Sequence, residues 1–108
     1  MRAGAARGAP SLHDVYARSE MMVGRRIADE FVLVPIVGHG AQLDSIFNLN
    51  RVGTVIWQQL DGRRRGEQIV EALVARFQVD HATAQADYLR FLAKLSSIGA
   101  VHRVVDDA

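Results

Sequence analysis

The sequence predicts an α+β domain in which a three-stranded antiparallel sheet is followed by three helices, an outline that is winged-helix-like. Short segments rich in Val and Ile, separated by glycine and other turn residues, occupy residues 21–49 and favour strands. Longer segments with apolar residues every three or four positions occupy residues 50–98 and favour helices. Strands and helices that are segregated along a chain are typical of α+β domains. A length of 108 residues predicts one domain with a single modest core.

Three extended segments predict the strands of this sheet. They read "MMVGRRIA" from residue 21, "FVLVPIV" from residue 31 and "AQLDSIFNL" from residue 41. We expect turns at Asp29-Glu30 and at Gly38-His39-Gly40. Because proline cannot donate to a strand ladder, the middle strand should end or bulge near Pro35.

The first helix should begin at Asn50, whose side chain can accept a hydrogen bond from the first turn. Val52, Ile56 and Leu60 then repeat every four residues, and Asp61-Gly62 should end the helix. Trp57 is interpreted as part of the core or its margin. Gly53 lowers helix propensity, which indicates close approach of another part of the chain.

Two further helices and one short strand complete the prediction. A second helix is expected over residues 67–77, and a third runs from Asp80, a good N-cap, to Ile98 before Gly99. The segment "AVHRVV" after Gly99 predicts a last strand.

The ends of the chain are expected to be tails. Residues 1–20 are rich in Ala, Gly and Arg and predict a flexible N-terminal tail, followed by the folded domain over residues 21–105 and a C-terminal tail at 106–108. No apolar run is long enough for a membrane span or a secretory signal. The chain has no cysteine, which excludes disulfides and thiolate metal sites and fits a cytoplasmic location.

Nucleic-acid binding is the alternative function, because winged-helix domains often bind DNA. The charge of the chain gives this alternative little support. The formal net charge is only +1. The run Arg63-Arg64-Arg65 is interpreted as a solvated turn between two helices. A recognition helix should direct several positive or amide side chains toward the groove of DNA. The third helix offers Arg90 and Lys94, which are offset by Asp80 and Asp87.

The residues do not predict an enzyme, a metal site or a cofactor. The four histidines lie in four different segments and form no zinc-binding pair. Ser45 lacks the sharp turn and the neighbouring base that a nucleophilic serine needs.

The third strand is an expected edge of the sheet that carries little protection. Alternation places Phe47 on the face that packs on the helices and Ile46 on the other face, with Asp44 as the one charged residue. Such an edge can accept an extended peptide as an added strand. Coverage of the edge by the tail, or by a second copy of the chain in a homodimer, is an equal alternative on these grounds.

Two motifs resemble the PqqD-like family. The first is L-N-x-x-G-x-x-I-W-x-x-L-D-G at residues 49–62, and the second is F-L-x-x-L-x-x-x-G at residues 91–99. The resemblance extends over about residues 22–105. Similar sequences usually begin the second helix with Ser or Thr, whereas Arg65-Gly66 stands here.

The resemblance implies a peptide-recognition element of ribosomal peptide biosynthesis. Such a protein is a non-catalytic adaptor that binds the leader of a precursor peptide as a strand antiparallel to its third strand. It presents that peptide to a modifying enzyme, often a radical S-adenosylmethionine enzyme. Carried onto this chain, the peptide-binding residues are Leu43, Asp44, Ser45, Ile46 and Phe47 of the strand and Asp87, Arg90 and Lys94 of the facing helix. Arg90 and Lys94 share a helix face, and we expect them to read an acidic leader.

Overall fold

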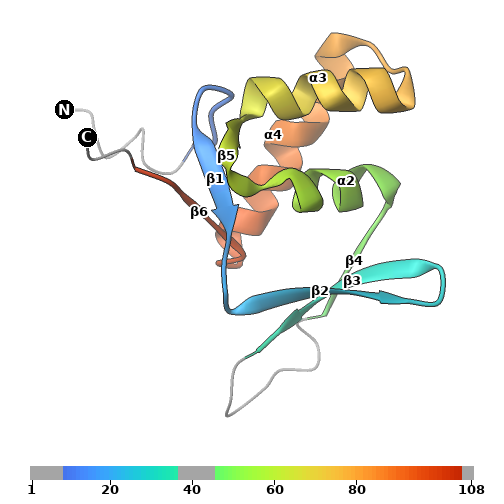
Figure 1. The fold of residues 1–108 in the computed structure, drawn as a ribbon, viewed down its shortest axis with the longest axis vertical. Helices are drawn as coiled ribbons and strands as arrows, with labels where there is room; N and C mark the ends of the chain where they lie inside the picture. Colours follow the sequence, from blue (N-terminus) through green and yellow to red (C-terminus); the bar gives the residue numbers. More distant parts are fainter. Residues whose placement is uncertain (1–8, 37–45, 106–108) are drawn as a thin grey trace.

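In a computed structural model that describes residues 9–36 and 46–105, the chain forms two antiparallel sheets and three helices (Figure 1). The first sheet has the order β2-β3-β4, formed by Met22–Ile27, Glu30–Pro35 and Phe47–Leu49. The second has the order β5-β1-β6, formed by Asp61–Arg65, Val15–Arg18 and Val101–Arg103. The helices are α2 (Arg51–Gln59), α3 (Gly66–Phe77) and α4 (His81–Ser97). The predicted α+β class is confirmed.

The expected order of one sheet followed by three helices is wrong in two places. Residues 15–18, expected within a flexible tail, form β1, the central strand of the second sheet. Residues 63–65, expected as a turn, belong to β5, and Arg65 pairs with Val15. Both strands are short, and only Tyr16 among their side chains is buried, so neither gives an apolar alternation that a sequence pattern can reveal. The three arginine side chains of β5 are exposed, as expected.

The first sheet agrees with the predicted meander where it is described. A two-residue turn, Ala28-Asp29, joins β2 to β3 one residue before the predicted Asp29-Glu30 turn, and β3 ends at Pro35, which is paired with Met22. Strand β4 pairs antiparallel with β3 and covers residues 47–49 of the expected segment 41–49, of which residues 41–45 lie outside the described residues. The predicted turn at residues 38–40 lies outside the described residues.

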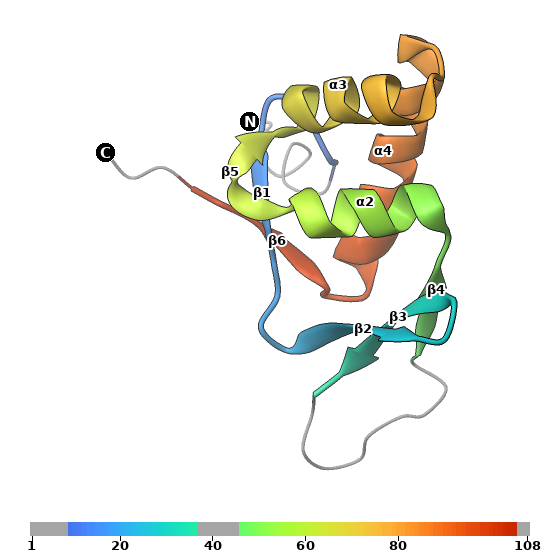
Figure 2. The same ribbon diagram turned by 45° about the vertical axis from the view of Figure 1, so that its right-hand side comes forward.

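The core lies where the three helices meet the two sheets. In Figures 1 and 2, α2 lies between α3 and the β2-β3-β4 sheet, and α4 crosses behind α2 and α3. Helix α4 buries Tyr88 and Leu92 completely, and Ile56 of α2, Ile69 of α3 and Leu33 of β3 are buried equally well. Trp57 is 4% exposed, which confirms that it belongs to the core.

Side-chain caps begin two of the three helices, α2 and α4. Asn50 caps α2, as predicted, because its Oδ1 accepts the Gly53 N–H at 2.7 Å. Asp80 caps α4 in the same way at 2.7 Å from the Thr83 N–H, and its hydrogen bonds from Thr83 lower its carboxyl pKa below the usual value.

Helix α3 has no Ser or Thr cap, and the N-terminal segment supplies the missing acceptors. The Gly66 N–H donates to the Asp14 carbonyl at 3.2 Å, and the Glu67 N–H donates to the Leu12 carbonyl at 3.0 Å. The Gln68 side chain in turn accepts the Arg65 N–H at 2.9 Å. Main-chain carbonyls therefore stabilise the start of α3.

Replacing the cap of α2 should destabilise the domain moderately. We expect Asn50→Ala to lower the free energy of unfolding by about 1 kcal/mol, because the Gly53 N–H loses its acceptor. Asn50→Asp keeps an oxygen at that position and should stay within a few tenths of a kcal/mol of the wild type. Urea denaturation measures both variants, and equal stability of the alanine variant would contradict the capping role.

Candidate functional site

Strand β4 presents an edge that no described residue pairs with. Its other edge pairs with β3 through the Cα partners Phe31 with Leu49 and Leu33 with Phe47. Phe47 and Leu49 are half-buried against the core, whereas Asn48 is exposed. Ile46, which directly precedes the strand, is 44% exposed.

A groove runs between β4 and the side of α4 that faces it. It consists of two adjoining hollows of about 340 and 230 Å³ that share Asn50, Phe91 and Lys94. Its apolar floor comes from β3, β4, α2 and α4. The apolar residues that line it are Leu33, Ile46, Phe47, Leu49, Val52, Ile56, Phe91, Leu95 and Ile98. We call this hollow surface the β4–α4 groove.

The rim of the β4–α4 groove on α4 is polar and mostly cationic. Asp87, Arg90 and Lys94 all line the groove, as their spacing predicts. The Arg90 guanidinium donates to the Asp87 carboxylate at 3.2 Å, and the Arg90 side chain is 75% exposed. Lys94 forms no ion pair with any residue that the structure describes. Lys94 is thus the cation of this rim whose charge is least compensated.

The structure brings together five of the eight predicted site residues. They are Ile46, Phe47, Asp87, Arg90 and Lys94. The other three, Leu43, Asp44 and Ser45, lie outside the described residues.

Sequence reasoning missed the apolar floor of the groove. Phe91 lines both hollows but is not among the predicted site residues. Its position between Arg90 and Lys94, four residues after Asp87, was a usable signal, because residues three or four apart share a helix face. Asn50 also lines both hollows, although its cap role alone was predicted.

The groove is suited to noncovalent binding of an extended chain. The free edge of β4 offers backbone groups, the floor offers apolar contact, and the rim offers positive charge. Within residues 9–36 and 46–105, no group of three His, Cys, Asp or Glu side chains could hold a metal ion. Among the same residues, no helix is both long and apolar enough to cross a membrane.

The chain is similar in sequence to a family of biosynthetic proteins. The family model described as coenzyme PQQ synthesis protein D (PqqD) matches residues 30–101. No curated protein matches the chain significantly.

Solved structures with this fold include two complexes with leader peptides. TbiB1 in complex with the TbiA(beta) leader peptide is 32% identical, with a TM-score of 0.66 over 83% of this chain and 99% of that chain. The lasso peptide synthetase B1 complexed with the leader peptide is 15% identical, with a TM-score of 0.67 over 81% and 96%.

A third structure is a PqqD truncation of Methylobacterium extorquens PqqCD. It is described as a functional, stand-alone recognition element for ribosomally synthesized and post-translationally modified peptides, and it is 24% identical. Its TM-score is 0.71 over 90% of this chain and 98% of that chain. The two matches below 25% identity establish the similarity of the fold.

Proposed function

The chain belongs to the family of coenzyme PQQ synthesis protein D, and from this premise we propose that its β4–α4 groove binds the leader of a ribosomally made precursor peptide. The leader adds to β4 as a further antiparallel strand. The observation that carries the proposal is the open edge of β4 beside an apolar groove on α4. TbiB1, at 32% identity over most of this chain, was solved with a leader peptide, which supports the same class of ligand here.

Affinity and selectivity come from different parts of this groove. Backbone hydrogen bonds to the β4 edge provide affinity that does not depend on the leader sequence. Alternate side chains of the added strand point toward the floor, where Phe91 and Leu95 favour apolar residues. Lys94 and Arg90 on the rim favour acidic residues of the leader.

The chain acts as a non-catalytic adaptor beside a peptide-modifying enzyme in the cytoplasm. We propose a radical S-adenosylmethionine enzyme as the type of partner, on the strength of the family resemblance alone. The adaptor holds the leader while the enzyme acts on the remainder of the precursor. The arrangement of α2, α3 and α4 with a flanking hairpin is interpreted as winged-helix-like.

Amide hydrogen exchange tests strand addition directly. In an antiparallel edge strand, alternate N–H groups point away from the sheet and are free to bond an added strand. With a cognate leader peptide at roughly 100 times its dissociation constant, these β4 amides should exchange up to about 100-fold more slowly. The amides of β2, the opposite edge of the same sheet, serve as the internal control and should not change.

Two outcomes would contradict this binding mode. Protection of β2 in place of β4 would move the leader to the other edge of the sheet. The other outcome is that the β4 amides are already protected without the leader, and that sedimentation detects a dimer which the leader does not dissociate. This outcome would show that a second copy of the chain occupies the edge.

A further inference from the structure

A second hollow lies on the other side of α2 from the β4–α4 groove. It has a volume of about 200 Å³ and is lined by the tip of the β2–β3 hairpin, the start of α2 and the end of α3. Residues 51, 54, 55 and 58 of α2 line this hollow, whereas residues 52, 53 and 56 line the groove. These two sets occupy different faces of α2, and the two sites adjoin at Leu49 and Asn50, which line both. We call the second site the arginine hollow.

Three arginines from three separate elements line the arginine hollow. Arg26 comes from β2, Arg51 from α2 and Arg76 from α3, and the single acidic residue among the lining residues is Asp29. None of the three arginines forms an ion pair or a side-chain hydrogen bond with a residue that the structure describes, whereas Arg64, Arg90 and Arg103 each do. The hollow therefore carries uncompensated positive charge.

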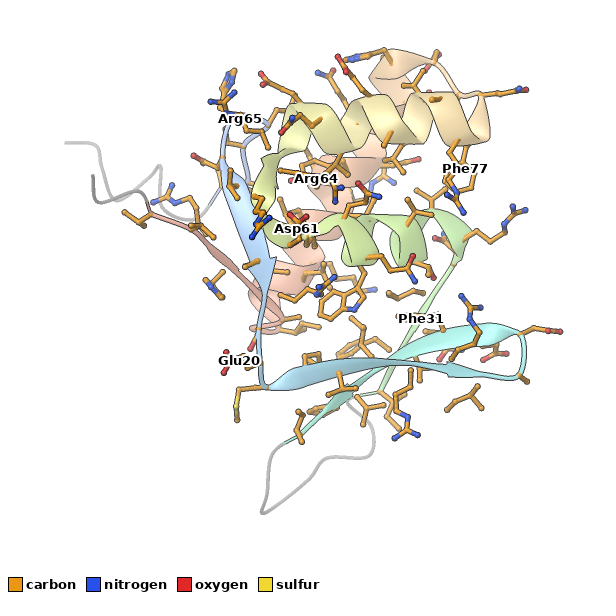
Figure 3. All side chains as sticks on the ribbon, in the orientation of Figure 1. Glu20, Phe31, Asp61, Arg64, Arg65 and Phe77 are labelled. Atoms are coloured by element: carbon orange, nitrogen blue, oxygen red, sulfur yellow. The ribbon has the colours of Figure 1, made fainter. Side chains whose placement is uncertain are left out.

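Two of these guanidinium groups lie over aromatic rings of the hollow. The Arg26 guanidinium carbon is 5.5 Å from the Phe31 ring centroid, and that of Arg51 is 5.8 Å from the Phe77 ring centroid. Figure 3 shows Phe31 and Phe77 on opposite sides of the start of α2. Packing of a guanidinium on a ring limits its freedom but leaves its N–H groups available. Such a planar fork matches a carboxylate, which it can bind through two parallel hydrogen bonds.

The surroundings favour a carboxylate on a peptide over a free phosphate. Phosphate sites at a helix start use several backbone N–H groups, but here Asn50 takes the Gly53 N–H at 2.7 Å. The positive charge of the hollow thus comes from side chains. Its walls include Phe31, Leu49, Val55 and Phe77, which can contact apolar residues beside an acidic one.

We propose that the arginine hollow binds an acidic segment of the peptide-modifying enzyme. This partner rests on the proposed function, because it is the enzyme that must sit beside the leader-loaded adaptor. A leader strand on β4 lies on the α4 side of α2, and none of the three arginines of the hollow lines the β4–α4 groove. The two sites can then be occupied together, one by the leader and one by the enzyme.

A hexaglutamate peptide is a suitable probe for the arginine hollow in the full-length chain. In an NMR titration, hexaglutamate should shift the side-chain Nε–H signals of Arg26, Arg51 and Arg76, and hexaglutamine should not. The substitution Arg26→Gln/Arg51→Gln/Arg76→Gln should weaken hexaglutamate binding about tenfold, the combined effect of three exposed ion pairs.

A matched control removes three other exposed arginines and the same net charge. The variant Arg25→Gln/Arg63→Gln/Arg65→Gln should bind hexaglutamate within about twofold of the wild type, because these residues do not line the hollow. An equal loss in both variants, or no binding to the wild type, would overturn the proposal. Inorganic phosphate that shifts the same three signals with similar affinity would overturn it in favour of a small-anion site.

Leader affinity, measured in the same variants, distinguishes a failure of this proposal from a failure of the proposed function. Leader affinity should be unchanged in the Arg26, Arg51 and Arg76 triple variant. Unchanged leader binding together with unchanged hexaglutamate binding would overturn the arginine hollow and leave the leader groove standing. A leader that loses affinity in the triple variant would show that the leader, and not the enzyme, occupies the hollow.

Discussion

The double substitution Arg90→Glu/Lys94→Glu is expected to raise the dissociation constant of the leader complex about 30-fold. Exposed ion pairs contribute roughly 0.2–1 kcal/mol each, and charge reversal adds repulsion of similar size. Two reversed charges therefore cost about 2 kcal/mol, which corresponds to roughly 30-fold in affinity. Isothermal titration calorimetry with the acidic leader measures the change.

The two cations should not contribute equally to leader binding. The Arg90 guanidinium is 3.2 Å from the Asp87 carboxylate, so part of its charge is already compensated within α4. Lys94 has no such partner among the described residues and lines both hollows of the groove. We therefore expect Lys94→Glu alone to weaken binding more than Arg90→Glu alone.

A charge-matched variant separates local recognition from the overall field of the protein. Arg25→Glu/Arg63→Glu changes the net charge by the same amount on exposed positions of β2 and β5, outside the groove. It should alter leader affinity by less than about threefold at physiological salt, where charges beyond a Debye length are screened. An equal effect of both double variants, or full affinity of Arg90→Glu/Lys94→Glu, would remove these cations from the recognition site.

The second large effect is expected at Gly66, where an alanine should lower the free energy of unfolding by about 3 kcal/mol. A Cβ at this position would lie 2.7 Å from Cε2 of Tyr88 and 2.9 Å from Cα of Leu12. Tyr88 is completely buried, and Leu12 belongs to the segment that supplies acceptors to α3. Neither neighbour can yield without loss of packing or of the hydrogen bonds at the start of α3.

Whether Gly66→Ala lowers or raises the free energy of unfolding shows whether a Cβ clashes at this position. Alanine is the better helix former, so without a clash the substitution at the start of α3 would stabilise the domain. Gly99→Ala is a useful comparison, because Gly99 has a φ of +73° and nothing within 4 Å of its ideal Cβ. Its cost should be about 1 kcal/mol from the backbone conformation alone. Urea denaturation that finds Gly66→Ala as stable as the wild type would rule out the close approach.

The parts of the fold that could be predicted are those with long periodic patterns or definite caps. The apolar repeat of α2, the cap at Asp80 and the end of β3 at Pro35 all follow local rules, and the structure agrees with them. Strands β1 and β5 could not be predicted, because each is stabilised by a partner far away in the sequence. A four-residue strand with one buried side chain carries almost no local signal.

The candidate site likewise contains residues that could be predicted from the sequence and residues that could not. Helical spacing was enough to place Asp87, Arg90 and Lys94 on one rim, since a helix fixes which residues are neighbours. The arginine hollow was not predictable, because Arg26, Arg51 and Arg76 come together only after three elements have packed.

The central position of β1 has a consequence for the order of events when the protein is synthesised. Strand β1 lies near the N-terminus, yet its partners are β5 in the middle of the chain and β6 near the C-terminus. Such non-local pairing gives the second sheet a high contact order, so this sheet should form slowly. On the ribosome, β1 can pair with β5 only after residues 61–65 have emerged, and the sheet is complete only after residues 101–103 have emerged. The β2–β3 hairpin needs only adjacent residues and can form well before that.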